Sequence, residues 1–420
     1  MAELNYFEIF VPGGFPRHTY NPRPTLQLEL RLAEVRQNLC KLATVTGHTK
    51  SGKTVLTRKI FPREECVWID GGLVGEERDL WDLVIEQLEL FQSNQTQAQT
   101  EIIGTVSAKA GAEGSIFVAK ASTEFAGSLS GKNASGEAAT QSLTSRVAAL
   151  QGLRESMRPL VIDDFHYLAK ELQGNVVRAL KQLIFDGLPV VVIAIPHRRY
   201  DAMKVEREMT GRVFPIQIPA WDGEELAFIP RTGFGLLNHV VDGTIRDRLV
   251  SESIGSPHLM QDFCRTLCKR QQLKAAGQQE ALTVAVDELN AVFGDVAETI
   301  GRPIFEKLAR GPRQRSDRMI RKLRDGNTVD IYGLVLHALA HIRPGLITLE
   351  YEDLRSAIRE VSAHEIPQLH EVARVLKHMA SIAATDESST PVIDFEEAEK
   401  KLHITDPFFA FYLRWGRLDQ

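Results

Sequence analysis

Apolar residues recur along the chain with two different spacings. Short runs rich in apolar and β-branched residues, typical of buried strands, occur at Leu42–Thr46, Cys66–Ile69, Leu160–Ile162, Val190–Ile195 and Val213–Ile218. Between them, apolar residues return every three or four positions, most regularly over Glu77–Phe91 and Leu143–Met157, and predict amphipathic helices. Strands and helices that alternate in this way indicate an α/β core with a parallel sheet covered on both faces. We place this core at residues 28–220.

The pattern becomes helical after Trp221 and mixed near the end of the chain. We expect a helical domain over residues 221–300, a connector over 301–328 and a small mixed domain over 329–420. The helices predicted in these parts are Glu224–Leu237, Ile245–Ser253, His258–Gln272, Val284–Phe293, Ile331–Ile342, Tyr351–Val361, Gln368–Ala384 and Glu396–Lys401. The aromatic residues after Asp406 are expected to pack as core.

A glycine-rich segment interrupts the predicted core at about residues 92–142. Gly, Ala, Ser, Thr and Gln dominate it, and charged residues are few. Ile116–Ala121 and Phe125–Leu129 have strand character with glycine around them, which fits a β-hairpin insert. A flexible loop accounts for the same composition equally well.

Composition narrows the class of protein. With 420 residues, 43% of them hydrophobic and 25% charged, the chain is an ordinary globular protein, which excludes disordered, collagenous and disulfide-rich classes. Its net charge of −5 argues against coating nucleic acid by bulk charge. The 4 cysteines, the lack of a signal peptide and the lack of a membrane-length apolar run lead us to expect a cytoplasmic protein without a membrane partner.

The most specific motif follows the first predicted strand. Gly47-His48-Thr49-Lys50-Ser51-Gly52-Lys53-Thr54 matches the phosphate-loop pattern G-x-x-x-x-G-K-[ST]. Glycines let backbone N–H groups turn toward phosphate oxygens, and the helix that starts at Lys53 and continues through Val55 adds positive potential. We expect Lys53 to reach the β- and γ-phosphates of ATP and the Thr54 hydroxyl to bind Mg²⁺. Gly47 to Val55 are therefore the candidate ATP site.

Two acids follow another apolar run. Asp163 and Asp164 come directly after Leu160–Ile162, just over a hundred residues beyond the phosphate loop. We expect Asp163 to hold Mg²⁺, directly or through water, and Asp164 to polarise the attacking water. Many strands end in aspartate, so the pair gains this meaning only together with the phosphate loop.

A basic cluster marks the connector. Seven Lys or Arg side chains and a single acid, Asp317, lie between Arg310 and Arg324. Such a cluster binds nucleic acid or an acidic partner, or it is the solvated face of an interdomain helix. The predicted helix Gln368–Ala384 offers only a thin basic face for duplex DNA, made of Arg374, Lys377 and His378.

These motifs, their spacing and the helical region after the last core strand resemble the AAA+ ATPases and the neighbouring STAND class. Within these, the chain looks most like the origin-recognition-like, archaeal-type and transposon target-selection ATPases. The resemblance runs from about Tyr20 onward, and its specific part is the phosphate loop with the Asp163–Asp164 pair. It implies an α/β P-loop ATPase core, a helical lid and a C-terminal winged-helix domain.

The resemblance also implies roles for residues outside these motifs. In such families the segment before the core, here residues 1–27, wraps the adenine, so Tyr20 and Arg23 would touch the base or the phosphate side. A plain strap with a stacked tyrosine is the alternative. Arg212, with Arg207 as the second candidate, stands where AAA+ proteins place an arginine finger aimed at a neighbour's γ-phosphate. A simple surface arginine is the alternative there.

Sensor residues are implied at two more places. Gly255-Ser256-Pro257-His258 looks like the lid element in which His258 would sense nucleotide, although a serine cap followed by proline also makes an ordinary helix start. The strand Val190–Ile195 resembles the one that ends in a polar sensor, and here His197 or Arg198 follows it.

The resemblance implies an ATP-binding and ATP-hydrolysing switch that forms a homo-oligomer and controls a separate effector protein, as in prokaryotic antiviral defence. One alternative is an initiator or transposition-type ATPase that assembles on duplex DNA. The other is a scaffold that holds nucleotide without turnover.

Overall fold

The computed structural model describes residues 4–37, 39–90, 135–195, 211–275, 277–312, 318–363, 366–384, 392–397 and 399–418. It divides into two compact units. The first, the sheet unit, contains Leu30–Val45 and Thr57–Ile216, and the second contains Met1–Glu29, Thr46–Leu56 and Gln217–Gln420. The glycine-rich segment of the sequence lies largely outside the described residues.

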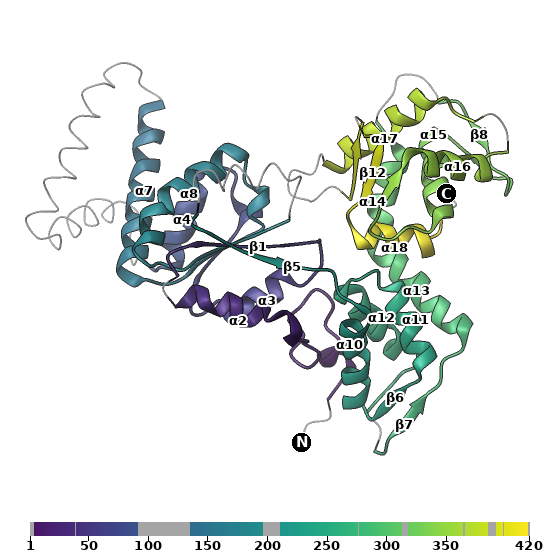
Figure 1. Ribbon diagram of the computed structural model, residues 1–420, viewed down its shortest axis with the longest axis horizontal. Coiled ribbons are helices and arrows are strands. Elements are labelled where there is room, and N and C mark those ends of the chain that lie inside the picture. The colour runs from purple at the N-terminus through teal and green to yellow at the C-terminus, as the bar shows by residue number, and fades with distance from the viewer. Residues whose placement is uncertain are drawn as a thin grey trace, which may run out of the picture. The chain divides into compact units, whose positions relative to one another are not determined.

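A parallel sheet forms the centre of the first unit (Figure 1). Five strands of the described chain take part in the order β2-β3-β4-β1-β5. Their bounds are β1 (Leu42–Gly47), β2 (Val67–Asp70), β3 (Leu160–Asp163), β4 (Val190–Ala194) and β5 (Val213–Ile218). Ile162 of β3 lies between Ile69 of β2 and Val192 of β4. Because both faces are covered, these strands are apolar almost throughout.

Helices lie on both faces of this sheet (Figure 1). On one face are α4 (Glu77–Gln87), α7 (Ser135–Ser156) and α8 (Lys170–Phe185). On the other are the shorter α2 (Leu28–Ala33) and α3 (Lys53–Ile60). The α/β core expected from the spacing of apolar residues is therefore confirmed.

The second unit begins with an N-terminal strap and continues with the lid helices. The strap contains α1 (Tyr6–Ile9) and the 3₁₀ turn η1 (Pro24–Leu26). The lid consists of α10 (Gly223–Leu236), α11 (Gly243–Glu252), α12 (Pro257–Arg270) and α13 (Val286–Ile300). A pair of parallel three-residue strands, β6 (His239–Val241) and β7 (Glu280–Leu282), is an addition to the predicted helices.

The C-terminal part combines helices with a three-stranded antiparallel sheet of order β10-β12-β11. Its helices are α14 (Arg302–Arg310), α15 (Ile331–Ile342), α16 (Tyr351–Val361), α17 (Leu369–Ala384) and α18 (Pro407–Trp415). Its strands are β8 (Arg321–Lys322), β9 (Thr328–Val329), β10 (Thr348–Glu350), β11 (Ile393–Glu396) and β12 (Lys401–Ile404). The described connector thus holds a helix and a short β8–β9 hairpin.

The helix predicted at Glu396–Lys401 is wrong, because this stretch contains the turn between β11 and β12. Leu402 and Ile404 are buried and alternate with more exposed neighbours, which is the period of two of a β-strand. This strand, β12, pairs with β10 on one side and with β11 on the other. A run of glutamate and lysine suggested a helix, but the buried alternation beyond it decides the structure.

One hydrophobic core joins the lid to the C-terminal helices. Phe411 of α18 packs against Phe263 of α12 and Phe293 of α13, with ring centroids 4.9 and 6.2 Å away. The Trp415 indole N–H donates a 2.8 Å hydrogen bond to the Glu252 carboxylate of α11. The expected packing of the terminal aromatic residues is therefore confirmed. Within the described chain, no helix has the combined length and apolar character needed to cross a membrane.

Candidate functional site

The phosphate loop links β1 to α3 through two left-handed residues. Lys50 has φ +60° and Gly52 has φ +91°, a conformation that favours glycine at the second position. Gly47 is needed for another reason, because a Cβ atom there would lie 2.7 Å from the carbonyl oxygen of Ile218 and 3.0 Å from Ser51 Oγ. The loop therefore requires glycine at both fixed positions of the motif.

Lys53 is held inside this loop. Its side chain is only 7% exposed, and Nζ donates hydrogen bonds to the carbonyl oxygens of Gly47 (3.0 Å) and His48 (2.8 Å). In the same loop, the hydroxyl oxygens of Thr49 and Ser51 are buried without a hydrogen-bond partner in the described chain. A buried ammonium group together with buried hydroxyls is a donor set that suits phosphate oxygens.

The remaining loop residues are half-buried or exposed. Thr54 and Val55 lie in the first turn of α3, where both are half-buried. His48 and Lys50 are exposed, and Lys50 Nζ lies 5.3 Å from the centre of the Phe408 ring at the start of α18. A contact between the loop and the C-terminal helix was not expected from the sequence.

The two aspartates lie at the carboxyl end of β3, in the sheet unit. Asp163 is buried and stands level with Asp70, the last residue of β2. Asp164 has φ +49°, and its backbone N–H donates to Asp163 Oδ1 at 3.0 Å. Burial, together with Asp164, Asp70 and Asp163, raises the pKa of Tyr167 to about 12. The sharp turn at Asp164 therefore concentrates negative charge at this end of the strand.

The strap positions Tyr20 and Arg23 differently. The Tyr20 ring stacks on Phe15 at 6.2 Å, and burial with a hydrogen bond to Glu29 raises the pKa of its hydroxyl. Arg23 is only 4% exposed and has φ +50°. Tyr20 therefore packs within the strap, and its expected contact with the base stays a prediction.

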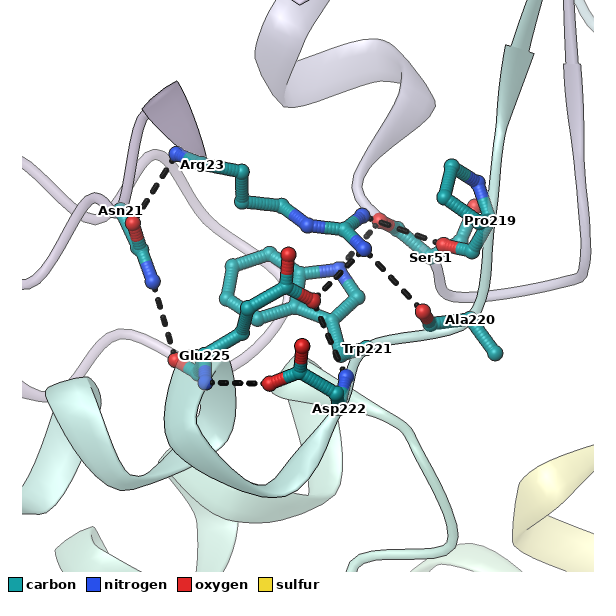
Figure 2. A network of polar contacts seen from close by, with 8 residues as sticks. All are labelled: Asn21, Arg23, Ser51, Pro219, Ala220, Trp221, Asp222 and Glu225. Atoms are coloured by element: carbon teal, nitrogen blue, oxygen red, sulfur yellow. Dashed lines mark hydrogen bonds and ion pairs between the residues drawn. The ribbon is translucent and has the colours of Figure 1, made fainter. Parts of the chain in front are cut away.

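The Arg23 guanidinium contacts the segment between β5 and α10 (Figure 2). Nη1 donates to the Pro219 carbonyl at 3.1 Å, and Nη2 donates to the Ala220 carbonyl at 3.0 Å. Nη2 also lies 2.7 Å from the Glu225 carboxylate, and the guanidinium carbon is 4.9 Å from the centre of the Trp221 ring. The Arg23 guanidinium is therefore held by contacts within the chain, and its expected role toward base or phosphate stays a prediction.

His258 lies in the first turn of α12. Ser256 caps this helix by accepting from the Leu259 N–H at 3.4 Å, as the local sequence predicts. The His258 ring lies 4.9 Å from Phe408, and Nε2 is 3.4 Å from Asp262 Oδ2. Burial, with a contribution from Lys50, lowers the pKa of His258 to about 4, so the ring is neutral near pH 7. The structure thus brings His258 into the surroundings of the phosphate-loop Lys50.

Arg212 immediately precedes β5 in the sheet unit. It is exposed, and its guanidinium lies 5.1 Å from the centre of the Phe185 ring at the end of α8. The other candidates for contact with the γ-phosphate, Arg207, His197 and Arg198, lie outside the described residues.

The arginines of the connector make contacts within the C-terminal part. Arg318 pairs with Asp330 and stacks 4.4 Å from the Tyr332 ring centre. Arg321 lies 3.8 Å from Glu371, and Arg324 donates to the backbone carbonyl oxygens of Ser362 and Arg359. On α17, Lys377 pairs with Glu397 and His378 contacts the Tyr332 hydroxyl. Each of these side chains therefore has a partner within the C-terminal part.

Sequence reasoning missed Trp221 and Phe408. Each touches the phosphate loop, Trp221 by donating its indole N–H to the Ser51 carbonyl at 2.9 Å and Phe408 through Lys50. The available signal was positional, because Trp221 comes three residues after the last core strand, directly behind a Pro-Ala pair. A contact between residues 170 positions apart has no local pattern that could predict it.

Comparison with solved structures gives similarity over nearly the whole chain. The Walker-type ATPase of Pyrococcus abyssi has 14% sequence identity and a TM-score of 0.50, over 92% of this chain and 94% of that chain. Cdc6p from Pyrobaculum aerophilum has 12% identity and a TM-score of 0.45, over 98% of each chain. The ORC1 protein of Aeropyrum pernix in complex with DNA has 12% identity and a TM-score of 0.46, over 97% of this chain and 96% of that chain. No protein-family model and no curated protein sequence matches. The chain therefore has the fold of a Walker-type P-loop ATPase.

Proposed function

We propose that the chain is an AAA+ ATPase that binds ATP with Mg²⁺ and hydrolyses it. The observation that carries this proposal is the buried Lys53 ammonium group, enclosed by the loop carbonyls of Gly47 and His48. The same loop holds the buried hydroxyls of Thr49 and Ser51, which have no hydrogen-bond partner within the described residues, so the loop is suited to an anionic, oxygen-rich ligand. The loop motif and the Walker-type fold narrow that ligand to a nucleoside triphosphate.

Each residue of the candidate site has a distinct role in this proposal. Lys53 and the backbone N–H groups of the loop bind the β- and γ-phosphates. The Thr54 hydroxyl and the Asp163 carboxylate would hold Mg²⁺, which supplies charge neutralisation at the phosphates. Asp164 accepts a hydrogen bond from the attacking water and turns its oxygen toward the γ-phosphorus. Arg212 acts on the γ-phosphate of a neighbouring copy, which makes the active form a homo-oligomer.

The contact between the phosphate loop and α18 supports a switch. Lys50 lies against Phe408 and also lowers the pKa of the neighbouring Asp406, while burial has the larger, opposite effect and raises it. Phosphate binding changes the charge around Lys50, and this change alters its interaction with α18. Through α18 the nucleotide state reaches the C-terminal part, a winged helix in this proposal, which would contact a separate effector protein.

The connector contacts give no support to the alternative of duplex DNA binding, since Arg318, Arg321 and Arg324 each have partners within the chain. The scaffold alternative differs from the proposed function only in turnover, so it is separated by a hydrolysis assay.

Two measurements on purified protein test the proposal. ATP affinity is measured by calorimetry with Mg²⁺, and turnover by phosphate release. Lys53→Ala should weaken ATP binding by more than about 30-fold, because the phosphates lose a buried charged partner. Lys59→Ala, which changes an exposed lysine of the same helix, is the matched control and should retain wild-type affinity. Equal ATP affinity in the wild type and in Lys53→Ala would contradict the phosphate-loop assignment.

A further inference from the structure

The hydrogen bond from Trp221 to Ser51 connects the phosphate loop to the start of the lid (Figure 2). The indole N–H of Trp221 donates to the Ser51 carbonyl oxygen at 2.9 Å. Ser51 stands between the two left-handed residues of the loop, Lys50 and Gly52. The Ser51 carbonyl oxygen is therefore held by a donor from outside the loop, and successive backbone N–H groups in such turns form concave sites for anions.

The orientation of this peptide matters for phosphate binding. In a trans peptide the C=O and N–H bonds point in opposite directions. The Ser51 carbonyl and the Gly52 N–H belong to the same peptide group, so holding the Ser51 oxygen on Trp221 also fixes the direction of the Gly52 N–H. A backbone N–H donor with a fixed direction binds a phosphate oxygen without a further ordering cost.

Arg23 in turn holds Trp221. Its guanidinium lies over the indole ring and donates to the carbonyl oxygens of Pro219 and Ala220, the two residues before Trp221. The Arg23 backbone N–H donates to Asn21 Oδ1 at 2.9 Å, and Asn21 Nδ2 donates to the Glu225 carbonyl at 3.0 Å. Both the ring and the backbone of the segment before α10 are therefore restrained by the strap.

The first turn of α10 completes the network. Asp222 accepts from the Glu225 N–H at 2.8 Å, and the Glu225 carboxylate accepts from the Asp222 N–H at 3.0 Å, a reciprocal helix cap. The same Glu225 carboxylate lies 2.7 Å from Arg23 Nη2. The Glu225 carboxylate therefore takes part both in the N-terminal cap of α10 and in the ion pair with Arg23.

We propose that Trp221 is a positioning residue for phosphate binding, which orients the Ser51–Gly52 peptide, and that Arg23 acts through Trp221. This inference rests on the proposed function of the phosphate loop. It makes nucleotide affinity depend on the position of the first turn of α10, because a rotation of that turn moves the indole N–H away from Ser51.

The first test uses Trp221→Phe, which keeps a ring in place but removes the N–H donor. Affinity for ATP and for ADP should fall about 3- to 10-fold, the value of one hydrogen bond, whereas affinity for adenosine should stay unchanged because it has no phosphate. Trp81→Phe is the matched control, since Trp81 also donates its indole N–H, at 3.0 Å to Glu77, but lies in the sheet unit. It should leave ATP affinity unchanged.

Arg23 is tested by a double-mutant cycle. Arg23→Ala should lower ATP affinity as Trp221→Phe does, and the double variant should be no weaker than either single variant, because both act on one peptide group. Arg23→Lys should restore only part of the affinity, since it cannot reach both carbonyl oxygens in the plane of a guanidinium. Fully additive losses would mean that Arg23 contacts the nucleotide itself and would overturn its assigned role.

A spectroscopic measurement on the otherwise unchanged protein avoids any folding defect of the variants. The protein is labelled with 5-fluorotryptophan, and the resonance missing from Trp221→Phe identifies Trp221. Inorganic tripolyphosphate should shift this resonance and leave that of Trp81 in place. The positioning role alone would be overturned by three results together. The wild type binds ATP, its Trp221 resonance does not shift with tripolyphosphate, and Trp221→Phe has wild-type ATP affinity. A wild-type protein that binds no ATP would overturn the proposed function as well.

Discussion

The backbone N–H of Leu42 donates to the Arg212 carbonyl oxygen at 2.8 Å, so Arg212 lies level with the first residue of β1. The phosphate loop follows Gly47, at the other end of the same strand. Arg212 therefore stands beside the start of this strand, and we propose that it acts on the γ-phosphate of a neighbouring copy.

This geometry predicts complementation between two inactive variants. Arg212→Ala should bind ATP normally but lose turnover, and Asp164→Ala should also lose turnover. An equimolar mixture should recover roughly a quarter of wild-type activity if subunits mix at random in a closed oligomer, because only a variant with an intact Asp164 beside a neighbour with an intact Arg212 is competent. Steady-state phosphate release measures the recovery.

The matched control for the finger is Arg154→Ala, which removes another exposed arginine of the same unit, paired with Asp186 at 3.9 Å. It should keep wild-type turnover. Activity per subunit that stays constant on dilution, together with no recovery in the mixture, would refute action on a neighbouring copy.

The two acids at the end of β3 should separate binding from turnover. Asp164→Asn should keep ATP affinity and lower turnover by about 100-fold or more, because the amide cannot accept a proton. Asp163→Asn should weaken ATP binding in the presence of Mg²⁺ and change it little when EDTA is present. Calorimetry with and without Mg²⁺, alongside phosphate release, distinguishes the two roles.

Asp186→Asn serves as the control, since this exposed aspartate follows α8 in the same unit. Turnover at the wild-type rate in Asp164→Asn would place the general base at another residue.

The core strands were predictable because each is a short run rich in apolar and β-branched residues between helical segments. Val213–Ile218 matches β5 residue for residue, and Leu42–Thr46 differs from β1 only by Gly47. The β6–β7 pair was missed because three-residue strands distant in sequence leave no periodic signal. The loop motif located Lys53, but the hydrogen bond from Trp221 to Ser51 depends on tertiary packing that no local pattern contains.

The connector arginines should contribute to stability. Arg318 pairs with Asp330, donates to the Pro312 carbonyl and stacks on Tyr332, while Asp330 itself caps α15. Arg318→Glu should therefore lower the free energy of unfolding by about 1–3 kcal/mol. Arg310→Glu is the control, because this residue is 79% exposed in its ion pair with Glu306. Urea unfolding measures both.

The same two variants test the alternative of duplex DNA binding. The affinity for duplex DNA is measured at low salt. Arg318→Glu should change this affinity no more than Arg310→Glu does, because the Arg318 guanidinium has partners within the chain. Selective loss of duplex binding by Arg318→Glu, with unchanged stability, would show that Arg318 contacts phosphates instead.

Asp262 should make stability depend on pH. Burial raises the pKa of its carboxyl from 3.8 to about 6, although Arg265 opposes the change. The folded state therefore binds this proton more tightly than the unfolded state does, and stability is lost as the pH rises from about 4 through 6. Asp262→Asn removes this cost, so it should raise the free energy of unfolding at pH 8 by up to about 3 kcal/mol and by clearly less at pH 4.5.

His258 should show the opposite sign and so provides the comparison. Its pKa is lowered to about 4, chiefly by burial, so the folded state holds the neutral ring and loses stability as the pH falls from about 6.5 toward 4. His258→Gln should therefore gain stability relative to the wild type at pH 4.5 and not at pH 8, the reverse of Asp262→Asn. Urea unfolding of both variants at the two pH values measures the contrast. A stabilisation by Asp262→Asn that is the same at both values would contradict the raised pKa of Asp262.

ATP binding should raise the pKa of His258. The positive charge of Lys50 contributes to the lowered pKa of this ring, and bound phosphate would offset that charge. A titration of the His258 resonance with and without ATP measures the change.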